Sequence, residues 1–374
     1  MSFRYPSGII KPGFDPLGAQ TPEVIEYHLY SWGSGVDGRL GVGDTDNRSS
    51  PVRVGAATTW SEISCIDAHS IATRTDGTLW SWGNNGSGRL GLDDTDSRSS
   101  PVQVGALTTW SKIAAGQQFV IATKTDGTLW SWGIGASGQL GHDNVIYHSS
   151  PVQVGALTNW SYIAAGKRFS LATKTDGTLW TWGSSSNGQL GHDNVTNHSS
   201  PVQVGALTTW LKVAGGQYHT LAIKTDGTLW AWGRNAYHVL GDSTYVTKSS
   251  PIQVGALTTW SKIVTAHYHT VATKTDGTLW TWGNAYYGLL GLGNSNYYSS
   301  PKQVGALTTW LNIAAGRYHT VATKTDGTLW AWGSNGTGRL GLGNTTDYSS
   351  PKQVGALTTW GKIAAGENFN SAIL

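Results

Sequence analysis

Short runs of alternating apolar and polar positions recur along this chain and are separated by turn residues. The clearest run is Thr-Leu-Trp-Ser-Trp-Gly at residues 128–133, in which Trp130 and Trp132 share one face. That period of two is typical of a β-strand. Residues 121–124 form a similar run, and Asp126-Gly127 lies between the two. An Asp-Gly pair between β-prone runs predicts a hairpin, because glycine takes the positive φ that a tight primed turn requires.

This hairpin is repeated with a fixed spacing of 50 residues. A spacing in this range is typical of solenoids, propellers and arrays of small units. Copies of Lys/Arg-Thr-Asp-Gly-Thr-Leu-Trp-x-Trp-Gly lie at residues 74–83, 124–133, 174–183, 224–233, 274–283 and 324–333, and an eroded seventh copy lies at residues 27–33.

Each 50-residue unit contains two further strand-like runs. Residues 112–116 (Lys-Ile-Ala-Ala-Gly) carry the small side chains expected where several strands crowd around an axis. Residues 101–105 begin with Pro101, which suits an exposed edge strand. With the hairpin, these runs give four short strands per unit, and a long loop follows the third strand. Four-stranded units around a channel predict an all-β fold, a seven-bladed β-propeller.

The two ends of the chain complement each other. Residues 361–374 stop partway through the second strand of a unit, and residues 28–54 begin with the third strand of one. We therefore expect the N- and C-terminal strands to share the last blade, with residues 361–374 as its inner strands. Such closure removes the open sheet edges that promote aggregation.

Composition adds few constraints to this picture. Charged residues are 13% of the chain and the net charge is +3, which argues against a nucleic-acid partner. Cys65 is the only cysteine; it excludes a disulfide framework and is expected to be a small buried hydrophobe. The start of the sequence lacks a signal-peptide pattern, and no apolar run is long enough for a transmembrane helix or membrane insertion.

Residues 1–25 form a separate segment before the propeller of residues 26–374. Pro6, Pro12, Pro16 and Pro22 exclude a helix or a central strand there. The segment is either a disordered leader or an extended arm that orders against a partner subunit. For the second alternative, the apolar anchors are Phe3, Tyr5, Ile9, Ile10 and Phe14.

All 20 tryptophans lie in the repeats, at three positions of the unit. The positions are represented by Trp110, Trp130 and Trp132, and Tyr30 replaces one tryptophan of the second class. A stripe of tryptophans could stack on carbohydrate. A residue repeated in every blade is explained more simply as packing, and each buried side chain contributes about 1.5–3 kcal/mol.

Four sub-motifs recur together in these units: Gly-Gln-Leu-Gly, Pro-x-x-Val, Ala-Gly-x-x-His-Thr-x-Ala and Asp-Gly-x-x-Trp-x-Trp-Gly. Over residues 27–374 this pattern resembles the repeat of the regulator of chromosome condensation family. The resemblance implies a seven-bladed propeller closed by a shared blade. The founding member is a nucleotide-exchange factor for a small GTPase that also docks on nucleosomes, and some relatives are secreted inhibitors of β-lactamases. This chain lacks an evident inserted wedge and a basic tail, which puts exchange activity and chromatin docking in doubt.

Comparison of the seven units with one another locates their variation in two loops. The loops follow the first and third strands, so both emerge on one face, around the channel mouth. Tyr- and His-rich loops on a rigid scaffold are typical of a recognition surface, although drift in unconstrained loops would also vary them. The candidate binding residues are Gln118, Phe119, Arg168, Phe169, Tyr218, His219, Tyr237, His267, Tyr268, His269, Tyr286, Tyr287, Tyr297, Tyr298, Arg317, Tyr318 and His319.

We predict no catalytic residues, no metal site and no cofactor. The repeated aspartates, such as Asp126, serve the hairpin turn, and no phosphate-binding loop or nucleophile motif is present. His69, His219, His269 and His319 match the repeat histidine of the family, which favours a structural, hydrogen-bonded role. The loops carrying His142, His148, His192 and His198 could converge, but no ligand spacing supports a metal there.

The favoured interpretation is a non-enzymatic recognition propeller. Low charge, the absence of a signal peptide and the apolar N-terminal arm resemble phage or virus particle proteins. In such a protein the arm would attach to particle subunits, and the variable face would bind a protein or a host-surface ligand. The expected location is then the virion or the cytoplasm. The alternatives are an intracellular regulator that resembles the GTPase-exchange and chromatin-binding propellers, and a secreted protein inhibitor.

Overall fold

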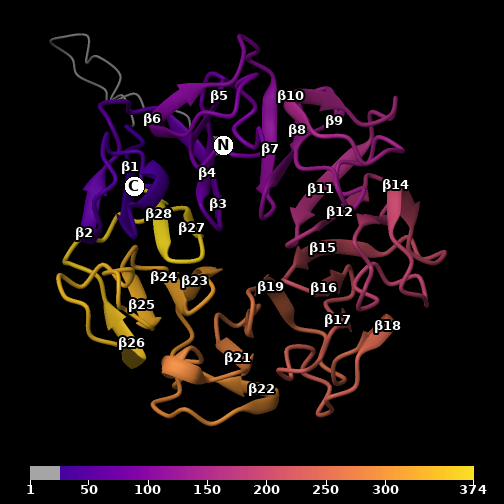
Figure 1. Cartoon of the computed structure of the whole chain (residues 1–374). Helices are drawn as coiled ribbons and strands as arrows, with labels where there is room; N and C mark the ends of the chain where they lie inside the picture. Colours follow the sequence, from indigo (N-terminus) through magenta and orange to yellow (C-terminus); the bar gives the residue numbers. More distant parts are fainter. Residues whose placement is uncertain (1–25) are drawn as a thin grey trace, which may run out of the picture.

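A computed structural model of the chain describes residues 26–374, and the predicted arm at residues 1–25 lies outside them. The described residues form seven four-stranded antiparallel sheets, arranged as blades around a central axis (Figure 1). This confirms the predicted seven-bladed β-propeller. The described helices are two short 3-10 turns, η1 (Val36–Gly38) and η2 (Tyr286–Gly288). No helix within residues 26–374 is long and apolar enough to cross a membrane.

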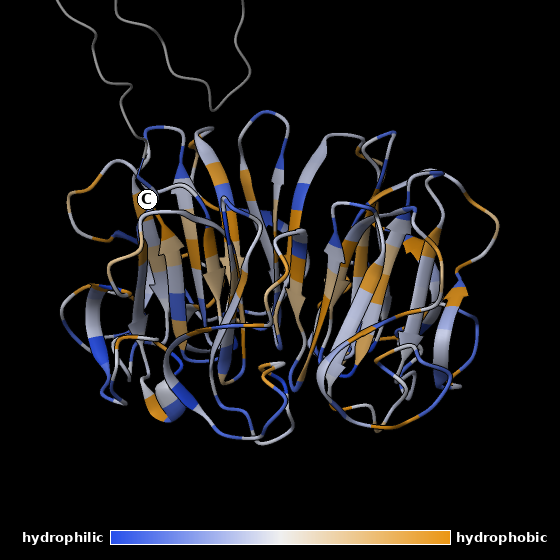
Figure 2. Ribbon diagram, turned by 90° about the horizontal axis from the view of Figure 1, so that it is seen from above, coloured by the Kyte–Doolittle hydropathy of each residue, from blue (hydrophilic) through white to orange (hydrophobic). Residues whose placement is uncertain are grey.

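Each complete blade has its strands in sequence order from the axis outward, and they run along the channel with loops at both ends (Figure 2). The first two strands of the chain, β1 and β2, belong to the shared blade. The strands are β1 (Leu29–Gly33), β2 (Arg48–Arg53), β3 (Trp60–Ile66), β4 (His69–Arg74), β5 (Leu79–Gly83), β6 (Arg98–Gln103), β7 (Trp110–Ala115), β8 (Phe119–Lys124), β9 (Leu129–Gly133), β10 (His148–Gln153), β11 (Trp160–Ala165), β12 (Phe169–Lys174), β13 (Leu179–Gly183), β14 (His198–Gln203), β15 (Trp210–Gly215), β16 (His219–Lys224), β17 (Leu229–Gly233), β18 (Lys248–Gln253), β19 (Trp260–Thr265), β20 (His269–Lys274), β21 (Leu279–Gly283), β22 (Tyr298–Gln303), β23 (Trp310–Ala315), β24 (His319–Lys324), β25 (Leu329–Gly333), β26 (Tyr348–Gln353), β27 (Ile363–Ala365) and β28 (Phe369–Ile373).

The hydrophobic core is divided among the interfaces between neighbouring blades. One cluster joins Ile71 and Leu79 of one blade to Trp110 and Trp132 of the next. Trp132 is fully buried, and its Nε1 donates a hydrogen bond to the carbonyl of Arg89 across the interface, at 3.0 Å. Equivalent bonds recur at other interfaces, for example from Trp182 to the carbonyl of Gln139 at 2.9 Å. The tryptophans therefore pack the blades together, as predicted.

The hairpin turn differs from the predicted one. The amide of Gly127 donates to the carbonyl of Lys124 at 3.0 Å, and the amide of Lys124 donates to the carbonyl of Thr128 at 3.1 Å. Gly127 has a φ of +78°, whereas Asp126 is not among the residues with positive φ. The connection is therefore a three-residue loop that ends in a left-handed glycine, not a two-residue primed turn. Asp126 instead accepts hydrogen bonds from the amide and the hydroxyl of Thr128, at 2.9 and 2.7 Å, which confirms its role in the turn.

Replacing this turn glycine is expected to be costly. A Cβ at position 127 would lie 2.0 Å from the carbonyl oxygen of Thr158, in addition to the left-handed backbone. Gly127→Ala should therefore lower the free energy of unfolding by about 2–4 kcal/mol. The matched control is Gly105→Ala, which has a φ of +59° but nothing within 4 Å of its Cβ; it should cost only about 1 kcal/mol. Denaturant unfolding of both variants measures the difference, and equal losses would contradict the steric argument.

The ring closes through a shared blade with the strand order β2-β1-β28-β27. β1 pairs with β28 in antiparallel register from Leu29↔Ile373 to Gly33↔Phe369. In Figure 1 the indigo N-terminal strands and the yellow C-terminal strands lie side by side in this blade. The predicted closure is confirmed, and residues 369–373 are structural.

Candidate recognition surface

The channel ends in a mouth formed by the loops that follow the inner strands. The inner strands β3, β7, β11, β15, β19, β23 and β27 line a cavity of about 400 Å³ with mostly small and branched apolar side chains. Cys65 lies on one of these strands and is buried, as predicted, and burial raises the pKa of its thiol to about 11. Where the inner strands end, one residue from each blade lines the cavity: Asp67, Gln117, Lys167, Gln217, His267, Arg317 and Glu367.

One side of this mouth carries a continuous set of aromatic and cationic side chains, which we call the aromatic arc. Tyr237 and Tyr268 come from adjacent blades, and their ring centroids are 4.9 Å apart. Tyr268 lies 5.6 Å from Tyr318 of the following blade. The arc consists of Lys167, Tyr218, Arg234, Tyr237, His267, Tyr268, Tyr287, Arg317 and Tyr318.

Cations lie against the tyrosine rings along the whole arc. Arg234 lies 5.6 Å from the ring centroids of both Tyr218 and Tyr237. Arg317 lies 5.0 Å from the ring of Tyr318, and Lys167 lies 5.5 Å from that of Tyr218. His267 remains neutral at pH 7, because burial and then the charges of Arg317 and Lys167 lower its pKa to about 3. The positive charge of the arc therefore resides on its arginines and on Lys167.

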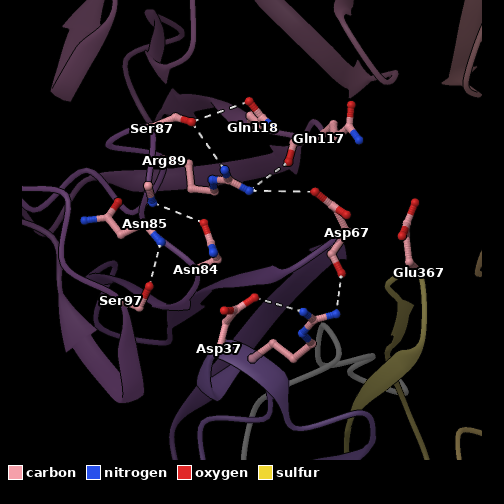
Figure 3. A network of polar contacts seen from close by, with 12 residues as sticks. Asp37, Asp67, Asn84, Asn85, Ser87, Arg89, Ser97, Gln117, Gln118 and Glu367 are labelled. Carbon is pink, nitrogen blue, oxygen red and sulfur yellow. Dashed lines mark hydrogen bonds and ion pairs between the residues drawn. The ribbon is translucent and has the colours of Figure 1, made fainter. Parts of the chain in front are cut away.

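The opposite side of the mouth is acidic. Figure 3 shows Arg89 next to Asp67 and Gln117, with Glu367 across from Asp67. The guanidinium of Arg89 lies 3.7 Å from the Asp67 carboxylate, and Arg317 pairs with Glu367 at 3.2 Å. Burial, and then the charge of Glu367, raise the pKa of Asp67, while Arg89 and Arg39 oppose that rise. The loop face therefore combines a basic aromatic side with a small acidic side.

The fold and the repeat are those of a known domain. The model of the RCC1-like domain family matches residues 28–372 of this chain. The chain belongs to the RCC1-like domain family. Among solved structures, human WBSCR16 shares 22% identity with it at a TM-score of 0.84, over 93% of this chain and 98% of that one. Prp20p of Saccharomyces cerevisiae, described with its binding to Gsp1p and histones, shares 21% identity at a TM-score of 0.84, over 94% and 92% of the two chains. Yeast RCC1 (Prp20) bound to Kap60 gives 20% identity at the same TM-score, over 93% of this chain and 88% of that one. At these identities the solved structures show a shared fold.

Five of the candidate binding residues belong to the core of this RCC1-like propeller, which corrects the sequence-based assignment. Phe119, Phe169, His219, His269 and His319 are 0–2% exposed. They occupy the first position of the second strand, and their side chains lie between blades rather than at the mouth. His269 Nε2 bonds to Thr320 Oγ1 at 2.8 Å, and His319 Nε2 bonds to Asn370 Oδ1 at 2.7 Å. The repeat histidine therefore joins neighbouring blades.

The remaining candidates are accessible but do not all belong to the arc. Tyr286 and Tyr297 are exposed and contact each other at 5.4 Å within one long loop. Tyr298 begins the outer strand β22, where its hydroxyl accepts a hydrogen bond from Asn294 at 3.3 Å. Gln118 is half-buried beside Ser87, and Arg168 is exposed next to Lys167. The structure thus brings together Tyr218, Tyr237, His267, Tyr268, Tyr287, Arg317 and Tyr318 and leaves these others outside.

Two members of the arc were missed from the sequence. Lys167 contacts Tyr218 of the adjacent blade, whereas Arg234 contacts Tyr218 and Tyr237 within its own blade. The 50-residue register could have identified Lys167, which is equivalent to His267 and Arg317. Arg234 directly follows Gly233 at the end of β17, and the equivalent positions of the other blades hold other residue types, so the sequence does not show its contacts with Tyr218 and Tyr237.

The four loop histidines form two separate pairs instead of one group. His142 and His148 have ring centroids 5.0 Å apart, and His192 and His198 have centroids 5.1 Å apart. Within residues 26–374, no three His, Cys, Asp or Glu side chains come together as a metal site would require. His142 Nε2 bonds to Ser131 Oγ and His192 Nε2 bonds to Thr181 Oγ1, both at 2.9 Å, so each pair is linked to the third strand of its own blade.

Proposed function

We propose that this chain is a non-enzymatic recognition propeller that binds a protein partner through its loop face, in the manner of an intracellular regulator. The aromatic arc carries the proposal. It places five tyrosine rings, two arginines and a lysine on adjacent blades of a rigid scaffold, within contact distance of one another. Tyrosine and arginine are the side chains that most often dominate protein–protein binding energy.

The chemistry of the arc indicates the kind of surface that it would bind. Tyrosine rings provide apolar area at a low cost in side-chain entropy. The neighbouring guanidinium groups can pair with carboxylates, and Arg234 has no ion-pair partner among the described residues. An acidic protein segment with apolar side chains fits this combination better than a basic one does.

The comparisons favour this regulator interpretation over a phage or virus particle protein. Prp20p is described by its binding to Gsp1p and histones, and yeast RCC1 was solved with Kap60. None of these relatives is a particle protein, so the particle interpretation, with its host-surface ligand, receives no support from them. Gsp1p and histones are therefore the first proteins to test as partners of this chain, and the basic charge of histones makes them the poorer match to the arc.

Binding should be measured with the wild-type chain and with a Tyr218→Ala/Tyr268→Ala variant. Purified Gsp1p and histones are the first probes, followed by capture from an extract of the source cells with identification by mass spectrometry. A partner of the arc should bind the double variant at least about 30-fold more weakly, since one hot-spot side chain contributes about 2 kcal/mol or more. The matched control is Tyr147→Ala, which removes an exposed tyrosine outside the arc and should leave binding unchanged. A partner that binds both variants as tightly as the wild type would exclude the arc as its site.

A further inference from the structure

A second ring of side chains surrounds the end of the channel opposite the loop mouth. Its members are equivalent residues near the start of each inner strand: Glu62, Lys112, Tyr162, Lys212, Lys262, Asn312 and Lys362. Each lies five residues before the mouth residue of its blade, which corresponds to about 17 Å along an extended strand. We call this set the lysine ring.

A backbone irregularity accompanies this position. In the sheet of β11 and β12, Trp160 pairs with Lys174 but Tyr162 pairs with Thr173, so Ser161 is an extra residue in the ladder. The same register shift occurs at Lys212 and Lys262. A bulge of this kind redirects the following side chain. It accounts for the convergence of Lys212, Lys262 and Lys362 on one cavity of about 390 Å³, together with Tyr162, Asn312 and Glu62.

The ammonium groups of the ring are only partly satisfied. Lys212 Nζ donates to the carbonyl of Ser261 at 2.7 Å, and Lys262 Nζ donates to the carbonyl of Leu311 at 2.6 Å and to Asn312 Oδ1 at 2.7 Å. Each ammonium has three N–H donors, so at least one remains for a further acceptor. Lys362 alone has a carboxylate partner, Glu62, at 2.5 Å.

The ring therefore carries uncompensated positive charge. Three lysines and a single glutamate line the cavity, a surplus of two positive charges, and Lys112 occupies the equivalent position of a further blade. Burial, and then the charge of Lys212, lower the pKa of Lys262, so repulsion between these neighbours is not relieved by the protein alone.

The lysines are not needed at every blade to complete the fold. Tyr162 occupies the same position without an ammonium group, and its inner strand keeps the same pairing as the others. Asn312 makes the equivalent hydrogen bond to the next blade without a lysine: its side-chain Nδ2 donates to the carbonyl of Gly361 at 2.9 Å. Joining the blades therefore does not explain why four lysines occupy the ring.

We propose that the lysine ring binds a small multivalent oxyanion of the oligophosphate type at this end of the channel. Lys212 and Lys262 supply the main charge, Lys362 contributes from the side of Glu62, and the Tyr162 hydroxyl and the Asn312 amide are additional donors. An oligophosphate carries several charges within a volume that fits the cavity, and it supplies acceptors for the free N–H groups. This site is at the opposite end of the channel from the aromatic arc and does not depend on the proposed partner.

Titration calorimetry with sodium tripolyphosphate at low ionic strength tests the site. The wild-type chain should bind one tripolyphosphate saturably, and Lys212→Gln/Lys262→Gln should weaken binding at least tenfold. Lys302→Gln/Lys352→Gln is the matched control, because it removes two lysines from outer strands and leaves the ring intact; it should keep wild-type affinity. Lys212→Arg/Lys262→Arg should retain most of the binding, which guards against a folding defect in the Gln variant.

Two outcomes would overturn the proposal: the absence of saturable binding to the wild type, and equal loss of binding in the ring variant and the control. A second arm compares ATP with tripolyphosphate. Equal affinities would indicate that the phosphate chain alone is recognised, and tighter ATP binding would indicate a nucleotide as its source. Both of these results are consistent with an oligophosphate site.

Discussion

Acidification from pH 7.5 to pH 5 is expected to lower the free energy of unfolding steeply. His69, His219, His269 and His319 are fully buried, and burial is the largest cause that lowers the pKa of each to about 3. In the unfolded chain these side chains titrate near pH 6.5. Between these values the unfolded state binds more protons than the folded state, so stability is complete above about pH 6.5 and falls as the pH drops toward 3. Each histidine contributes a slope of about 1.4 kcal/mol per pH unit, so the four together can approach 5 kcal/mol per unit.

The chain itself provides the matched substitution for this prediction. Phe119, Phe169 and Phe369 occupy the equivalent position in three other blades and are fully buried. Neither ring nitrogen of His69 has a hydrogen-bond partner, so His69→Phe should preserve stability at pH 7.5 and reduce the acid slope by about a quarter. Denaturant unfolding at several pH values measures both quantities.

A contrasting variant separates protonation from packing. His319→Phe should also reduce the acid slope, but it leaves the amide oxygen of Asn370 without its donor, which should cost about 1–3 kcal/mol at neutral pH. If neither variant changes the slope, the buried histidines are not the source of the acid sensitivity.

Removal of residues 361–374 is expected to prevent formation of a stable monomeric ring. The deletion removes β27 and β28, and with them the five paired positions that join the chain ends. It also removes Phe369, Ala372 and Ile373 from two core clusters and leaves β1 as an exposed sheet edge, which promotes association with other chains. Light scattering and circular dichroism should show oligomers or aggregates without the cooperative unfolding of the full chain.

Removal of residues 1–25 is the matched control for this deletion. The 28 strands described within residues 26–374 all lie after residue 28, so this variant should unfold like the full chain. Adding a peptide of residues 361–374 to the shortened propeller should recover part of the monomer. If the variant without residues 361–374 were monomeric and as stable as the wild type, the pairing of β1 with β28 would not be needed to stabilise the ring.

The fold could be predicted because a single 50-residue sequence repeat specifies every blade. The 50-residue repeat gave the number of blades, the alternation within it gave the strands, and the incomplete units at the two ends gave the closure. The turn at Gly127 was assigned wrongly, because an Asp-Gly pair is compatible with both a two-residue primed turn and a three-residue loop. The choice depends on Asp126, whose side chain bonds to Thr128 in the folded hairpin.

The recognition surface was only partly predictable, for a reason seen in the loop after each inner strand. The variable stretch spans three positions, such as 217–219. All three vary among the blades, so variability alone does not show which position lies at the surface and which lies in the core. The structure shows that Gln217 lines the mouth and Tyr218 joins the arc, whereas His219 already begins β16 and lies in the core. Variation at the third position reflects alternative ways of filling a blade interface, histidine or phenylalanine, and not contact with a partner. The contact of Lys167 with Tyr218 joins neighbouring blades and requires the ring geometry, whereas Arg234 contacts Tyr218 within one blade.

The pairing of β1 with β28 also determines how the ring would respond to mechanical tension. Leu29 and Ile373, the pair of this ladder closest to the two chain ends, face each other at one end of it. Tension applied between the ends would therefore load the hydrogen-bonded pairs one after another, beginning at Leu29 and Ile373, instead of shearing all five at once. A strand pair loaded in this direction separates at low force. The propeller would thus open readily when it is pulled by its termini, although its core is divided among seven clusters between the blades.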